Sequence, residues 1–305
     1  MMFESFAIHM LSIILEAMPF VFLGTFLSSL IEIFISPEKI TQWFKEKKWY
    51  YYLLAGLIGI VMPVCECAIV PIMRRLVKKG VPIGVAITFL LATPIVNPVV
   101  LLSTYYAFSG DWAYVLGRGG LGFIGAVTIG ILMGKVSGTD QVLKETSELS
   151  CACGHDHNHD HHTPTFAKRV HHILKHMSSE FIEVSKYLIL GATIAAIMQT
   201  FISRQWILGV GNNIILSSVF MIILAYVLSL CSEADAFIAA TFRNLFPDAA
   251  IMAFLISGPM IDIKNTLMLL EGFKKEFVIR LTLYIGAFSL LLGLIFNLLI
   301  SQGDF

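Results

Sequence analysis

The chain has 305 residues, 57% of them hydrophobic and 14% charged, and its mean hydropathy is +0.80. The apolar residues form continuous runs long enough to cross a bilayer. These runs predict an all-α integral membrane protein, because backbone in lipid must satisfy its own hydrogen bonds. The formal net charge is zero, so no polybasic surface indicates nucleic acid as a partner. A phosphate-binding loop of the form Gly-x-x-x-x-Gly-Lys-Ser/Thr and a nucleophile triad are both missing, so we expect neither an ATPase nor another enzyme.

The apolar runs predict about eight transmembrane helices in two sets of four. The first set covers residues 5–35, 50–73, 82–108 and 112–133, and the second covers residues 179–202, 213–240, 247–270 and 277–300. The first run has neither a basic start nor a small-residue cleavage pattern, so we expect a retained helix and not a signal peptide. A polar segment separates the sets and predicts three domains: a first transmembrane repeat at 1–135, a Cys/His-rich loop at 136–176 and a second repeat at 177–305.

The two sets repeat each other in sequence. The offset between corresponding residues falls only from 167 to 165 along the half, as three pairs illustrate: Glu16 with Glu183, Cys65 with Cys231, and Asn97 with Asp262. Four spans in each half is an even number, so we expect two parallel repeats related by an axis along the membrane normal.

The second span of the first half carries the densest group of reactive side chains. Pro63 and Pro71 bracket Cys65, Glu66 and Cys67, and each proline removes a backbone donor and clashes with the preceding turn, which predicts a broken helix. On an intact helix the two thiols would point about 200° apart. In broken backbone both can face one chamber. Irregular backbone at membrane depth is tolerated only where protein or water surrounds it, so this break predicts a ligand site.

The third span of the first half is expected to be interrupted within residues 93–98. The dipeptides Thr93-Pro94 and, in the second half, Gly258-Pro259 are expected to unwind the helix. Unwound backbone there would offer carbonyl groups and the side chains of Asn97 and Asp262 to an ion or substrate. A plain helix kink is the other interpretation of these prolines.

Ionisable side chains inside the spans mark further candidates, because a charged group near mid-helix costs about 2.5–3.5 kcal/mol on insertion scales. The substrate-binding candidates are Glu16, Cys65, Glu66, Cys67, Asn97, Glu183, Cys231, Glu233, Asp235 and Asp262. A zinc site would want four ligands, which Cys65, Cys67, Cys231 and Glu233 can supply if the halves bring their breaks together. Of the others, Glu16, Glu183 and Asp262 are expected as proton-coupled groups or secondary ligands. The alternatives are small buried apolar cysteines, and carboxylates that lock the bundle by pairing with each other or with Lys186 and Lys264.

The polar loop contains a second group of metal-binding residue types: Cys151, Cys153, His155, His157, His159, His161 and His162. Imidazole and thiolate are favoured ligands of transition metals, so this composition predicts a metal sensor or buffer, with a merely solvated linker as the alternative. A segment of such composition is expected to lack regular structure when no metal is bound. We expect no obligatory cofactor, and Zn²⁺ as the substrate or ligand.

The chain resembles a family of predicted bacterial permeases that includes the organoarsenical efflux permeases. The resemblance rests on residues 63–67, on the basic exit at 74–80 and on Ala92-Thr93-Pro94, and it covers nearly all of the chain outside the loop. It implies a transporter of eight or more helices in which Cys65 and Cys67 contact the substrate. Glu66 and Ala68 stand where glycine or serine is more usual, and the Cys/His-rich insertion is not general. Both departures favour a divalent metal over an organoarsenical.

These features together predict a multi-pass permease of the cell membrane that carries a transition metal ion, zinc first, through a midplane site of cysteines and carboxylates. An efflux permease for trivalent arsenicals is the first alternative, and a metal-binding membrane subunit or sensor that transports nothing is the second. The expected partners are the lipid bilayer and a metal ion. The sequence is also compatible with a second membrane or extracytoplasmic subunit. Lysines and arginines divide almost evenly between the two sides, so they do not predict the orientation.

Overall fold

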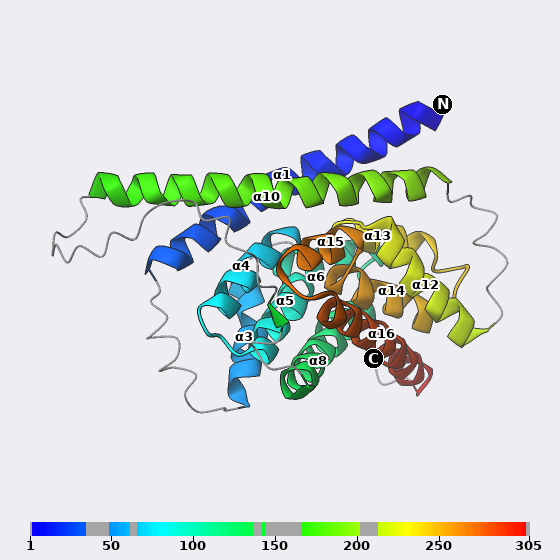
Figure 1. Ribbon diagram of the computed structural model, residues 1–305. Helices are drawn as coiled ribbons and strands as arrows, with labels where there is room; N and C mark the ends of the chain where they lie inside the picture. Colours follow the sequence, from blue (N-terminus) through cyan, green and yellow to red (C-terminus); the bar gives the residue numbers. More distant parts are fainter. Residues whose placement is uncertain are drawn as a thin grey trace.

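The computed structural model describes residues 2–34, 49–61, 66–136, 142–143, 166–201 and 213–302 of the chain (Figure 1). The first half forms α1 (Met2–Phe34), α3 (Tyr50–Val61), α4 (Glu66–Lys78), α5 (Ile83–Val96), α6 (Pro98–Ala107), α7 (Trp112–Leu116), the π-helical turn η1 (Gly117–Leu121) and α8 (Gly122–Val136). The second half forms α10 (Phe166–Phe201), α12 (Ile214–Leu228), α13 (Asp235–Thr241), α14 (Asp248–Met260), α15 (Ile263–Gly272) and α16 (Lys275–Gln302). Over the described ranges the β-structure amounts to one isolated bridge between Leu143 and Phe273, so the predicted all-α class is confirmed.

Five segments of the described chain are long and apolar enough to cross a membrane: Glu4–Leu30, Trp112–Val136, Met177–Thr200, Asp248–Gly272 and Lys275–Gln302. A sixth is obtained if α5 and α6, which meet at a bend of 41°, count as one span. Each half then contributes three spans and one shorter apolar helix, Tyr50–Ile60 or Ile214–Leu228. The multi-pass architecture is confirmed. The count of eight spans and the parallel relation of the repeats stay predictions.

The third span of the first half is interrupted within the predicted segment 93–98, three residues after Pro94. The α5 helix runs through Pro94 to Val96, and the chain leaves the helical conformation at Asn97, whose ψ is 125°. Pro98 follows directly, and a residue that precedes proline is driven away from the helical region by the proline ring. The predicted interruption within residues 93–98 is therefore confirmed, whereas the helix continues through Thr93-Pro94, where we expected it to unwind.

The third span of the second half behaves in the same way. The α14 helix continues through Pro259 to Met260, and the interruption consists of the extended residues Ile261 and Asp262. Asp262 caps α15, because its Oδ1 accepts a hydrogen bond of 2.7 Å from the Asn265 backbone N–H. Here too the break follows the proline, and it ends where the Asp262 side chain caps the next helix.

The second span is also split into two helices in each half. In the second half α12 ends at Leu228, Ser229 adopts a left-handed conformation with φ 48°, and α13 begins at Asp235. This interruption carries Cys231 and Glu233. In the first half α3 ends at Val61 and α4 begins at Glu66, and residues 62–65, which include the predicted ligand Cys65, lie outside the described residues.

The packing of the helices follows the sequence repeat. The equivalent helices α1 and α10 lie side by side across one face of the remaining helices (Figure 1). The equivalent pairs α5 with α14 and α8 with α16 also contact each other, and α4 contacts α15 just as α13 contacts α6. Such crosswise contacts between equivalent helices indicate a pseudo-two-fold relation between the halves. Nearly every residue of α5 and α14 is buried, so these two uniformly apolar helices form the centre of the bundle.

Two equivalent glycines bring α1 and α10 against the starts of the short helices. A Cβ on Gly24 of α1 would lie 2.5 Å from the carbonyl oxygen of Ala68 in α4, and a Cβ on Gly191 of α10 would lie 2.8 Å from the Cα of Lys264 in α15. Small residues at such crossings allow close backbone approach in membranes. The first helix of each half therefore packs directly on a helix that begins at a break.

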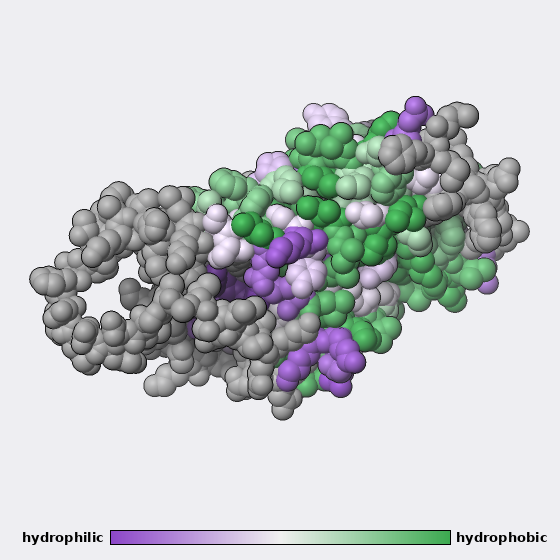
Figure 2. All heavy atoms as spheres, turned by 45° about the horizontal axis from the view of Figure 1, so that its top comes forward, coloured by the Kyte–Doolittle hydropathy of each residue, from purple (hydrophilic) through white to green (hydrophobic). Residues whose placement is uncertain are grey.

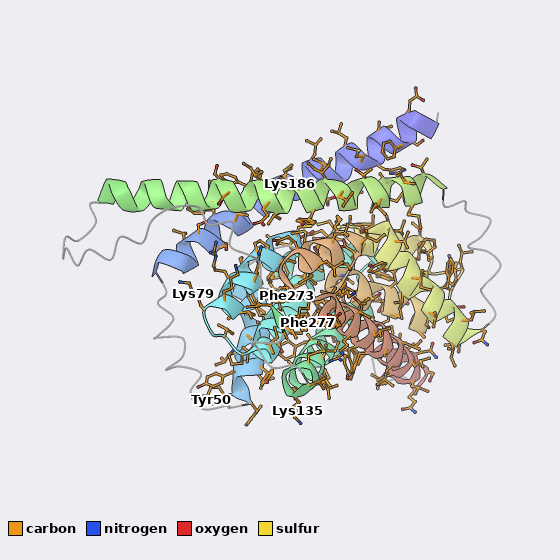
Figure 3. The ribbon with its side chains drawn as sticks, in the orientation of Figure 1. Tyr50, Lys79, Lys135, Lys186, Phe273 and Phe277 are labelled. Carbon is orange, nitrogen blue, oxygen red and sulfur yellow. The ribbon has the colours of Figure 1, made fainter. Side chains whose placement is uncertain are left out.

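The outer surface is largely apolar, as Figure 2 shows for one face. Leu15 of α1, Leu54 of α3 and Leu283 of α16 are each more than half exposed, which suits contact with lipid tails. Tyr50, at the start of α3, and Lys135, near the end of α8, both lie at the lower rim of the molecule in Figure 3. Tyrosine and lysine are typical of the boundary between lipid and water.

The polar loop is shorter than the sequence predicts. The α10 helix begins at Phe166, so residues 166–176, which we expected to lack regular structure, are helical. The metal-binding residue types Cys151, Cys153, His155, His157, His159, His161 and His162 lie outside the described residues.

Candidate functional site

Glu66 is the first residue of α4 and is only 2% exposed. Its Oε2 accepts a hydrogen bond of 2.8 Å from the hydroxyl of Ser232, which lies 166 positions further along the chain. That separation equals the repeat offset, so Glu66 and Ser232 occupy equivalent positions of the two halves. Equivalent positions touch only at the axis that relates them. This contact therefore places Glu66 and Ser232 at the pseudo-two-fold axis.

Lys264 and Asp262 lie beside Glu66 and come from the start of α15. The Lys264 Nζ is 3.3 Å from Asp262 Oδ2 and 3.9 Å from Glu66 Oε1, and all three side chains are at least 96% buried. No hydrogen bond reaches Asp262 Oδ2 from the residues that the structure describes. The group is thus held by charge attraction between the two halves, with little direct hydrogen bonding.

The two described cysteines of the breaks, one from each half, flank this charged group. Cys67 is 1% exposed, and its Sγ lies 4.0 Å from Glu66 Oε1. Cys231 is 7% exposed and its thiol contacts the Glu233 carboxylate. Neither cysteine is in a disulfide. The structure thus brings a thiol and a carboxylate from each half to one place.

A small cleft opens onto these groups. Its cavity volume is about 10 Å³, about the space that one water molecule needs, and its lining consists of Ile13, Glu16, Ala17, Phe20, Glu66, Cys67, Cys231 and Lys264. The α1 helix closes one wall through Glu16 and its apolar neighbours. The predicted residues Glu16, Glu66, Cys67 and Cys231 therefore share one chamber at the junction of the halves. We call this chamber the thiol cleft.

A second buried ion pair lies on the other side of Ser232. Arg118, which is fully buried in the π-helical turn η1, donates hydrogen bonds to Asp235 Oδ2 at 2.8 Å, to the Ser232 carbonyl oxygen at 3.0 Å and to Thr104 Oγ1 at 2.8 Å. Asp235 comes from the second half, whereas Arg118 and Thr104 come from the first. π-Helical turns are often found at functional sites. This pair forms a second connection between the halves.

Besides Asp235, which pairs with Arg118, two predicted site residues lie apart from the thiol cleft. Asn97 is buried, and its side chain accepts a hydrogen bond of 3.0 Å from the Val99 N–H, so it caps α6 and does not line the cleft. Glu183 lies 3.8 Å from Arg74, which also pairs with Glu271, and therefore belongs to a different cluster.

The structure describes only some of the predicted metal ligands. Among the described residues no group of three or more His, Cys, Asp or Glu side chains has an arrangement that can hold a metal ion. Cys67, Cys231 and Glu233 therefore do not form a preassembled set, and Cys65, the fourth predicted ligand, is outside the described residues.

Arg118 and Lys264 are the residues whose importance the sequence does not reveal directly. Both lie near the ends of the predicted spans, but they are 0% and 3% exposed inside the bundle. The feature that could have identified them is that each lies within a segment long enough to span a membrane, Trp112–Val136 for Arg118 and Asp248–Gly272 for Lys264. A cation there needs a buried acidic partner.

Comparison with known proteins agrees with this architecture. Residues 2–298 match the family described as "Predicted permease". The chain belongs to this permease family. It is 44% identical over 277 residues to UPF0718 protein YcgR of Bacillus subtilis, a match that covers 90% of this chain and 91% of the relative.

A second relative comes from Streptococcus mutans and is named as a putative subunit of a two-component membrane permease complex. It is 37% identical over 282 residues, which cover 92% of this chain and 90% of the relative. No solved structure matches the chain. Membership of a permease family, together with several apolar helices, establishes a multi-pass membrane protein and supports the expectation that the permease is not an enzyme.

Proposed function

We propose that this permease carries a thiol-binding metal cation, zinc first, through the thiol cleft. The observation that supports this most is that Cys67 from the first half and Cys231 from the second line one cleft with Glu66 and Glu16. Thiolate and carboxylate oxygens are both ligands that zinc accepts. A site shared by two pseudo-symmetric halves can open alternately to either side when the halves rock against each other.

The charge balance of the thiol cleft favours a cation over an oxyanion. Glu16 and Glu66 line the cleft, and Asp262 and Glu233 contact its lining residues. Against these four carboxylates the described lining offers one positive charge, that of Lys264. In a site of low dielectric constant an excess of negative charge attracts cations strongly.

The lack of a preassembled ligand set is compatible with a transport site. A structural zinc site is closed by four ligands, whereas a transported ion must be released. Cys67, Cys231 and Glu233 would close on zinc only in the occupied form, and Cys65 would join them. The Cys/His-rich loop would then bind the ion before or after its passage.

Efflux of a trivalent arsenical is the second candidate, because two thiols from opposite halves suit arsenic(III) as well as zinc. A neutral arsenical would not need the carboxylates. A third candidate is a metal-binding subunit or sensor without transport.

A flux measurement separates these candidates. The purified chain, reconstituted in vesicles that contain a zinc indicator, should carry Zn²⁺, and Cys67→Ser or Cys231→Ser should slow the flux at least about tenfold, because each removes a direct ligand. Deletion of residues 155–162 should weaken flux only at low zinc and leave uptake of phenylarsine oxide unchanged. Arsenical uptake without zinc flux would favour the second candidate, and zinc binding without flux would favour the third.

We also propose that the permease works with a second subunit. The support is the name of the Streptococcus mutans relative, which describes one subunit of a two-component complex. Gentle extraction of the tagged permease from its native membrane should therefore retain a second membrane or extracytoplasmic protein in stoichiometric amount.

A further inference from the structure

We propose that the Lys264 ammonium group is a tethered competitor of the transported cation: it neutralises Glu66 and Asp262 in the empty cleft and is displaced when a divalent metal binds. This inference rests on the proposed function. It adds a role for Lys264 and narrows the substrate class to cations, because a neutral arsenical would leave the lysine in place.

The first support is the loose geometry of the lysine. Its Nζ lies 3.3 Å from Asp262 Oδ2 and 3.9 Å from Glu66 Oε1, whereas strong hydrogen bonds from ammonium to carboxylate are about 2.7–2.9 Å long. Asp262 Oδ2 receives no hydrogen bond from any described residue, although it is buried. A buried carboxylate oxygen without a hydrogen bond can still bind a cation directly, and a metal ion is such a cation.

The second support is the position of the lysine relative to the predicted ligands. Lys264 lines the thiol cleft together with Cys67, Cys231 and Glu66. A divalent cation bound to those groups would lie within a few ångströms of the ammonium group, and like charges at such a distance repel strongly in a buried site. The ion and the ammonium group therefore cannot occupy the cleft together.

The third support is the contrast between the packing of the Lys264 backbone and the length of its side chain. The Cα of Lys264 packs closely against Gly191 of α10, where an added Cβ would come within 2.8 Å of it. The four-carbon stem of a lysine is flexible, so its charged end can change position without a shift of the Cα. Because Glu66 belongs to α4 and Lys264 to α15, displacement of the lysine also releases one link between the halves.

The fourth support is that the repeat does not require a lysine here. The equivalent position of the first half is Val99, at the offset of 165 that relates Asn97 to Asp262, and Val99 is 51% exposed. The charge is thus a feature of one half and of one cleft, not of the packing that both halves share.

The test compares zinc binding to the purified full-length chain and to three variants. The cleft component is defined as the zinc binding that is lost in the Cys67→Ser/Cys231→Ser double variant. Because the double variant keeps the Cys/His-rich loop, zinc bound to the loop cancels in this difference. Lys264→Gln should bind Zn²⁺ in this component about tenfold more tightly or better, because a competitor that fills the site most of the time lowers the apparent affinity by the empty fraction. Lys186→Gln is the matched control, since Lys186 is exposed on α10 (Figure 3) and should leave the affinity unchanged.

Unchanged or weaker zinc binding by Lys264→Gln, with a cleft component present in the wild type, would overturn the inference and leave the proposed function standing. If neither protein has a cleft component, the proposed function fails, and this inference fails with it. A second measurement needs no variant of Lys264. Saturating zinc should increase the reaction of Lys264 with a small amine-specific reagent in the wild-type protein, detected by mass spectrometry, and equal or reduced labelling would contradict displacement.

Discussion

Among the ion pairs that the described residues form between the two halves, the Arg118 pair and the Lys264 pair are built differently. Arg118 makes direct hydrogen bonds of 2.8 to 3.0 Å to Asp235, Ser232 and Thr104. Lys264 faces Asp262 and Glu66 at 3.3 and 3.9 Å beside an open cleft. Position near the axis therefore does not decide the role of a charge. A hydrogen-bonded pair fixes the halves, whereas a loosely held charge beside a cleft can be exchanged.

The largest effect is expected from breaking the fixed pair. Arg118→Gln leaves Asp235 buried without its charged partner, and loss of one member of a buried pair costs about 3–5 kcal/mol of folding free energy. The variant should unfold at a much lower temperature in detergent, as followed by fluorescence-detected size-exclusion chromatography.

The matched control is Arg243→Gln. Arg243 pairs with Asp111 at 2.6 Å, but the two side chains are 42% and 30% exposed, and exposed pairs contribute only about 0–1 kcal/mol. If Arg118→Gln and Arg243→Gln are equally mild, the Arg118 pair is not the anchor that its geometry indicates.

A smaller effect is expected from Ser232, which touches both pairs. Its hydroxyl donates to Glu66 and its carbonyl oxygen accepts from Arg118. Ser232→Ala removes only the first contact and should cost about 1–3 kcal/mol, as expected for a hydrogen bond to a charged group. Thermal unfolding measures the loss.

Ser289→Ala serves as the control for this change. Ser289 is fully buried, and its hydroxyl has no hydrogen-bond partner in the described part of the chain, so its removal should not destabilise the protein. Equal losses in the two variants would show that the Ser232 contact with Glu66 contributes nothing specific.

Much of the architecture was accessible from the sequence. The apolar runs predict the helices, and the slowly falling offset predicts which helices of the two halves correspond. The exact residue at which the third span breaks could not be predicted from Pro94 alone. The helix continues through Pro94 and ends before Asn97, because Pro98 disfavours the helical conformation of the residue that precedes it. Helix capping by a side chain, such as that of Asp262, depends on three-dimensional geometry, so the positions of prolines in the sequence do not predict it.

The candidate site was accessible only in part. Glu16, Glu66, Cys67 and Cys231 were predicted from their residue types and repeat positions, and the structure gathers them in one cleft. Lys264 and Arg118 were not predicted as site residues, because position along a span does not tell whether a cation reaches water or turns inward. Asn97 and Glu183 lie outside this cleft, since an equivalent place in the repeat does not guarantee an equivalent environment, and their role as substrate ligands stays a prediction.

The central claim is that sulfur from both halves meets in one chamber, and counting sulfur ligands tests it most directly. In a Cys65→Ser/Cys151→Ser/Cys153→Ser variant only Cys67 and Cys231 remain as thiols. X-ray absorption of bound Cd²⁺ should then report two sulfur ligands, and one after either cysteine is also replaced by serine. Cadmium without any sulfur ligand, or with one that is insensitive to Cys231→Ser, would contradict the shared chamber.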